Sequence, residues 1–86
     1  MEVNLDSKNR QKMMEVPGNT KKIILNVSRD KCNDVLLELV NAEGKATSKP
    51  LNKYLPEIKL KEPINNLRFT MNNFSTRPIQ IVVGFK

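Results

Sequence analysis

The chain has 86 residues, of which 38% are hydrophobic and 5% aromatic, and it carries a formal net charge of +6. This length suits a single domain that buries about 60–65% of its unfolded surface, and so lean a core often gains further burial from a partner subunit. The lone Cys32 excludes an internal disulfide, no apolar run approaches the ~20 residues that span a membrane, and the start of the chain lacks a signal-peptide pattern. We therefore expect a non-secreted, cytoplasmic protein with no membrane segment.

The N-terminal part of the chain is weakly patterned. Val3 and Leu5 alternate with polar residues, which predicts a short strand. Residues 6–16 are polar and show no helical periodicity, so we interpret them as a loop or an extended arm that packs on something else. A turn follows at Pro17-Gly18-Asn19, and we expect a β core over residues 20–86. The whole chain, residues 1–86, is then one domain.

Beyond that turn, short apolar stretches alternate regularly with turn residues. Further strands are predicted at residues 21–29, 35–40, 58–60, 67–71 and 79–85. Residues 45–56, rich in lysine and proline, are expected to form a connection. With no convincing helix, about six short, mainly antiparallel strands predict an all-β fold, a small single-domain β-sandwich or a small barrel.

The last two predicted strands are the strongest. Their alternation predicts a hairpin with a loop over residues 72–78. Arg68 falls in the polar phase of its strand and so belongs on the solvated face. The final strand is apolar in both phases, with Val82 on the face opposite Ile81 and Val83. Such a strand is central in a sheet, or is covered on both sides.

The sequence contains few of the residue patterns that catalysis requires. There is no histidine, the nine carboxylates show no acid–base or metal-ligand spacing, and three glycines form no phosphate-binding loop. The run Asp30–Asp34 faintly resembles a calcium loop, but it lacks the central Gly and the terminal Glu. We therefore predict a protein that is not an enzyme, with no cofactor, no metal and no small-molecule substrate.

The positive charge is concentrated in the second half of the chain, where residues 45–61 hold five lysines and a single glutamate. Such a field steers a protein toward nucleic acid or another acidic surface. Lysines also serve solubility and protect edge strands, and aromatic platforms for stacking bases are scarce here. Nucleic-acid binding is therefore kept as an alternative rather than the first hypothesis.

The function we predict is protein–protein contact by a structural or interaction protein, either as an oligomer or with a partner. The short strands and the Asn/Lys/Ile-rich composition resemble, in general character and without a diagnostic motif, small β-sandwich accessory proteins of phage particles. This resemblance implies a decoration, fibre-anchoring or adaptor role in a virion; a small inhibitor of a host protein is a further alternative. The candidate interaction surface comprises Lys45, Lys49, Lys53, Arg68, Thr70, Phe74, Arg77, Gln80 and Val82.

Overall fold

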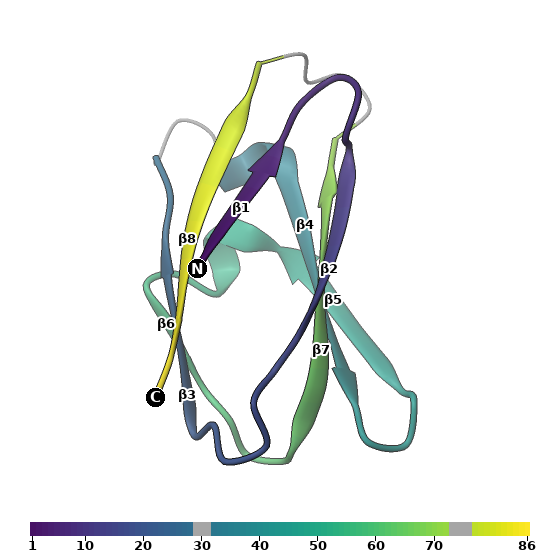
Figure 1. Ribbon diagram of the computed structural model, residues 1–86, viewed down its shortest axis with the longest axis vertical. Helices are drawn as coiled ribbons and strands as arrows, with labels where there is room; N and C mark the ends of the chain where they lie inside the picture. Colours follow the sequence, from purple (N-terminus) through teal and green to yellow (C-terminus); the bar gives the residue numbers. More distant parts are fainter. Residues whose placement is uncertain (29–31, 73–76) are drawn as a thin grey trace.

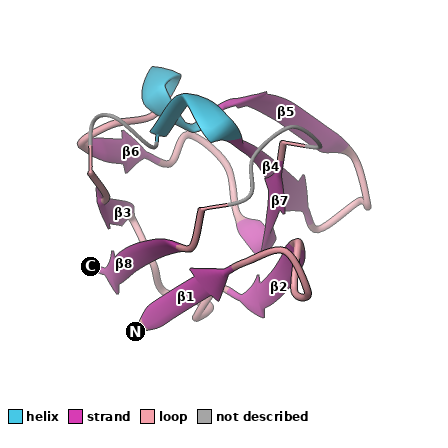
Figure 2. Ribbon diagram, turned by 90° about the horizontal axis from the view of Figure 1, so that it is seen from above, coloured by secondary structure: helices cyan, strands magenta, loops and turns pink. Residues whose placement is uncertain are grey.

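Two antiparallel four-stranded sheets pack face to face in the computed structural model, which describes residues 1–28, 32–72 and 77–86 (Figures 1 and 2). Sheet A has the order β1-β8-β3-β6 and sheet B the order β2-β7-β4-β5. The strands are β1 (Glu2–Leu5), β2 (Gln11–Glu15), β3 (Lys22–Asn26), β4 (Val35–Asn41), β5 (Ala46–Pro50), β6 (Glu57–Lys59), β7 (Ile64–Met71) and β8 (Ile79–Phe85), with short 3-10 turns η1 (Cys32–Asp34) and η2 (Leu51–Lys53). The prediction of an all-β sandwich is confirmed, and the barrel is not formed.

The core lies between the two sheets and is made by strands whose side chains alternate inward and outward. Leu67 and Phe69 of β7, Leu37 of β4, Ile81 of β8 and Ile23 of β3 are all 0% exposed. The strand register places Leu37 directly opposite Phe69, so the two side chains pack on the same inner face. Each such side chain stabilises the fold by about 1.5–3 kcal/mol through burial.

The interpretation of residues 6–16 as a loop or arm is wrong, because Gln11–Glu15 forms strand β2 at an edge of sheet B. β2 runs antiparallel to β7, with Met13 opposite Arg68. No residue of β2 is fully buried, and only Met14 is half-buried. Backbone pairing therefore holds this strand, and apolar alternation does not mark it in the sequence.

The predicted connection over residues 45–56 likewise contains a strand. Ala46–Pro50 forms β5, the other edge of sheet B, and all five of its residues are exposed. A tight turn with Gly44 at φ +83° joins it to β4. With β2 and β5 included, the sandwich has eight strands in the part of the chain that the structure describes, instead of about six.

The predicted hairpin between the last two strands is also wrong. β7 lies between β2 and β4 in sheet B, whereas β8 lies between β1 and β3 in sheet A. The chain therefore crosses from one sheet to the other between residues 71 and 79, and Figure 1 shows β7 and β8 on opposite sides of the sandwich. The expectation that β8 is a central strand is confirmed, and Val82 points outward with 43% exposure.

The two lateral sides of the sandwich differ. On one side β1 of sheet A passes directly into β2 of sheet B through a turn, in which Oδ1 of Asp6 accepts hydrogen bonds from the N–H groups of Lys8 and Asn9, each 2.8 Å long. These backbone hydrogen bonds, that from Asn9 first, hold the pKa of Asp6 below its usual 3.8. On the other side η1 and η2 lie between the edges of β5 and β6 (Figure 2).

Candidate interaction site

The outer face of sheet B combines exposed apolar side chains with an ion pair. In the strand register, Met13 of β2, Arg68 of β7 and Glu38 of β4 lie side by side in one row. The next row of the same face contains Thr70 and Leu36. We term these five residues the sheet-B face.

An ion pair stands at the centre of the sheet-B face. Nη1 of Arg68 donates to Oε2 of Glu38 over 3.2 Å, and both side chains are partly shielded, with 35% and 21% of their surface exposed. Arg68 and Glu38 are directly opposite each other on neighbouring strands, so the strand register brings their side chains together. In the adjacent row, Nε2 of Gln11 donates to Oγ1 of Thr70 over 3.2 Å. The polar groups of this face are therefore bonded to one another.

Apolar surface flanks that ion pair on two sides. Met13, next to Arg68, is 46% exposed, and Leu36, two residues before Glu38 on β4, is 41% exposed. Val40, two residues after Glu38, is half-buried on the same face. The sheet-B face therefore places two exposed apolar side chains beside a partly shielded arginine–carboxylate pair.

The outer face of sheet A differs from the sheet-B face. Its exposed apolar residue is Val82, and the residues directly opposite it, Glu2 and Asn26, are polar and exposed. A weak ion pair joins Lys22 and Glu57 over 3.6 Å. With Val82 exposed and Ile24 of β3 half-buried, this face also presents some apolar surface, of the scattered kind found on ordinary proteins.

The structure separates residues that the sequence placed together in the candidate interaction surface. Arg68 and Thr70 lie on the outer face of sheet B, whereas Gln80 and Val82 lie on the outer face of sheet A, on the opposite side of the molecule. The grouping followed from the hairpin that does not form. Phe74, which belongs to the candidate surface and falls in the predicted loop over residues 72–78, lies outside the residues that the structure describes.

The remaining predicted residues lie elsewhere. Lys45 is in the β4–β5 turn, where its N–H donates to Oδ1 of Asn41 over 2.9 Å, and Lys53 ends η2. Lys49 is on β5 with its ammonium 5.8 Å above the centre of the Tyr54 ring. Arg77 is exposed beyond β7. These basic residues therefore gather at the β5 side of the sandwich, apart from Arg77.

Sequence reasoning missed Met13, Leu36 and Glu38. The sequence signal for Leu36 was present, since it is the out-of-phase leucine in the run VLLELV at residues 35–40. Its neighbours Val35 and Leu37 point into the core, so Leu36 has to point out. Met13 gave no signal, because its strand is defined by pairing with β7.

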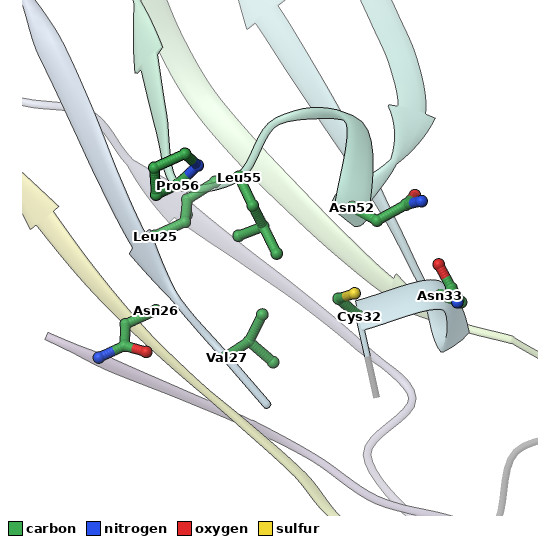
Figure 3. Close-up of a pocket in the computed structure, with 8 residues that line it drawn as sticks. All are labelled: Leu25, Asn26, Val27, Cys32, Asn33, Asn52, Leu55 and Pro56. Carbon is green, nitrogen blue, oxygen red and sulfur yellow. The ribbon is translucent and has the colours of Figure 1, made fainter. Parts of the chain in front are cut away.

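A hollow with a volume of about 560 Å³ lies between β3, η1 and η2 (Figure 3). Its lining consists of Leu25, Asn26, Val27, Cys32, Asn33, Asn52, Leu55 and Pro56. In Figure 3 the side chains of Val27 and Leu55 and the thiol of Cys32 border the hollow, whereas Asn26 points away from it. This lining supplies amides and one thiol, without a carboxylate or an amine for acid–base work.

Comparison of the chain with protein-family models, curated proteins and solved structures found no match. Within residues 1–28, 32–72 and 77–86, no three acidic, cysteine or histidine side chains are grouped so as to hold a metal ion. None of the helical segments in the described part of the chain is long and apolar enough to cross a bilayer.

Proposed function

We propose that this protein works by protein–protein contact, as a non-enzymatic subunit or adaptor of a larger assembly, and that the sheet-B face is its contact surface. The observation that carries the proposal is the pair of exposed apolar side chains, Met13 and Leu36, beside the shielded Arg68–Glu38 ion pair. Covering this face removes apolar surface from water, which favours association by roughly 25 cal/mol for each Å².

The shape of the sheet-B face also suits association. A sheet presents a broad pleated surface, and a second sheet packs against such a surface about 10 Å away. The polar groups in this face already have partners within the chain: Arg68 bonds Glu38, and Thr70 bonds Gln11. These two hydrogen bonds reduce the desolvation cost of covering the face, because Arg68 and Thr70 each keep a partner within the chain.

The setting we propose is a particle or multi-subunit assembly in which this chain is an accessory component, such as a decoration, fibre-anchoring or adaptor protein of a virus or phage. The small antiparallel sandwich supports this choice because it provides a rigid body with two outer faces. The lean core supports it as well, since a domain of this size gains stability when association buries more of its surface.

The test is association of the purified protein, measured by size-exclusion chromatography with light scattering at several protein and salt concentrations. Leu36→Asp is the test variant and Val82→Asp the matched control, since the two residues are 41% and 43% exposed on opposite outer faces. We expect an oligomer, or a complex with a co-purified partner, that Leu36→Asp disrupts and Val82→Asp preserves.

Two results contradict the proposal. One is a salt-independent monomer with no co-purified partner. The other is an assembly that both variants leave intact, because the contact then lies outside the sheet-B face. Circular dichroism of both variants establishes that each has kept its β fold before the comparison is made.

A further inference from the structure

A groove lies between the edge strands β5 and β6 beside Tyr54, the residue that follows η2, on the side of the sandwich away from the β1–β2 turn; we term it the β5–β6 groove. It has a volume of about 180 Å³ and is lined by Leu39, Thr47, Lys49, Tyr54, Ile58, Lys59, Leu60, Lys61, Glu62 and Ile64. This volume lies below the roughly 300–1,000 Å³ typical of small-molecule pockets. The groove therefore has room for a few side chains, with half-buried Ile58 and Leu60 as part of an apolar floor.

The rim of the β5–β6 groove is positively charged. Lys49, Lys59 and Lys61 line it, and Glu62 is the one acidic residue in the lining. In the part of the chain that the structure describes, these three lysines have no carboxylate within 4.0 Å, since the ion pairs formed there are Lys22–Glu57, Lys45–Glu43 and Arg68–Glu38. The fold therefore brings three lysines, up to 12 residues apart in the chain, to one rim, where no carboxylate of the described residues pairs with them.

Strand β5 beside the groove has an open edge. The N–H of Asn41 donates to the carbonyl of Lys45 over 2.9 Å, which sets the phase of the β4–β5 ladder. Backbone groups alternate in an antiparallel pair, so those of Thr47 face β4 and those of Ala46 and Ser48 face away from it. No strand among the described residues pairs with that free side of β5. Ala46 and Ser48 therefore offer an unpaired ladder to another chain.

We propose that the β5–β6 groove and the open edge of β5 bind an extended acidic segment of a partner protein, which adds as a strand beside β5. The backbone of the segment pairs with Ala46 and Ser48, and its carboxylates reach the lysines of the rim. Its small apolar side chains enter the groove beside Ile58 and Leu60. This surface lies on the side of the sandwich, so the inference does not depend on the sheet-B face.

Charge and shape select this occupant over two others. A second copy of the chain would bring the same lysines against Lys49, and like charges at an interface repel. Single-stranded nucleic acid needs exposed aromatic rings on which bases stack, but the ring of Tyr54 is 9% exposed and has the Lys49 ammonium above it. An acidic polypeptide uses the charge, the apolar floor and the backbone edge together.

The experiment is fluorescence polarisation with a labelled peptide of alternating glutamate and valine, about eight residues long to match an ordinary strand. The test variant carries Lys49→Ala, Lys59→Ala and Lys61→Ala together. We expect the wild type to bind the peptide and this variant to bind it at least about tenfold more weakly, a loss of about 1.4 kcal/mol. The same peptide N-methylated at alternate backbone positions should not bind, and the native peptide should shift the amide NMR signals of Ala46 and Ser48.

The matched control removes three positive charges away from the groove, with Lys8→Ala, Lys12→Ala and Arg77→Ala. It should bind the peptide within about twofold of the wild type, well under the tenfold change expected of the test variant. Equal weakening in both triple variants means that net charge alone attracts the peptide, and it overturns the proposal. Full binding of the N-methylated peptide, absence of binding by the wild type, or tighter binding of an oligo-dT strand of equal charge overturns it too.

Discussion

Replacing Tyr54 by phenylalanine should make the protein more stable. The Tyr54 side chain belongs to the core cluster, and its hydroxyl oxygen is buried without a hydrogen-bond partner among the residues that the structure describes. A buried hydroxyl that makes no hydrogen bond costs about 1–3 kcal/mol of folding free energy. Phenylalanine keeps the packing of the ring and its contact with the Lys49 ammonium, and it removes that cost.

Urea unfolding followed by circular dichroism measures the effect. The slope of unfolding free energy against urea is about 1 kcal/mol per molar for a small domain, so a gain of 1–3 kcal/mol raises the midpoint by about 1–3 M. The slope itself should not change, because Tyr54→Phe exposes the same surface on unfolding. A variant less stable than the wild type by about 1 kcal/mol or more refutes the reasoning, since the hydroxyl then makes a bond that matters.

The pH dependence gives a second readout of the same group. Burial raises the pKa of Tyr54 above its usual 10.0. The folded chain therefore holds the phenol proton more tightly than the unfolded chain, and the resulting stability is complete below pH 10 and is lost as pH rises toward the folded pKa. Tyr54 is the sole tyrosine and the chain has no tryptophan, so ultraviolet titration of the phenolate reports this pKa alone. A midpoint at or below 10.0 in the folded protein contradicts the buried environment.

Three further outcomes follow from the turns and the sheet-B face. Gly44→Ala should cost about 1–2 kcal/mol because Gly44 has φ +83°, whereas Gly18→Ala, in open space without a positive φ, should be neutral or stabilising by up to about 1 kcal/mol in the same urea assay. NMR titration of the Asp6 carboxyl should give a pKa below 3.8; the stability that Asp6→Ala removes should be present above pH 3.8 and disappear as pH falls through the folded pKa. A double-mutant cycle of Arg68→Met and Glu38→Leu should return a coupling of about 0.2–1 kcal/mol, and a coupling of zero would mean that the 3.2 Å pair adds nothing.

Apolar alternation identified the strands that supply the core. The buried residues recur at every second position in Val35 and Leu37 of β4, in Leu67, Phe69 and Met71 of β7, and in Ile79, Ile81 and Val83 of β8. β2 and β5 were missed because an edge strand is held by one backbone ladder and need not bury its side chains. Their sequences, QKMME and ATSKP, carry no period that distinguishes a strand from a loop.

The candidate surface depended on information that alternation does not contain. A period of two gives the face of a strand to which Arg68 or Gln80 belongs, and both do point outward as expected. It does not give the sheet to which the strand belongs, and so the two residues lie on opposite outer faces. Alternation could not predict that Lys49, Lys59 and Lys61 line one rim either. They do so because β5 and β6, which belong to different sheets, lie at the same side of the sandwich.

The order of strands in sheet A has a consequence for how the chain folds as it is synthesised. β8 follows the other described strands of the sandwich in the chain, yet it lies between β1 and β3 and pairs with both. The carbonyl of Met1 accepts from the N–H of Val83 over 2.7 Å, so the first strand waits for the last before its ladder can close. The described strands of sheet B end at Met71, so this sheet can form before β8 has been synthesised. Until β8 arrives, the apolar faces of β1 and β3 remain exposed, and that interval is when a nascent chain of this topology is most prone to aggregate.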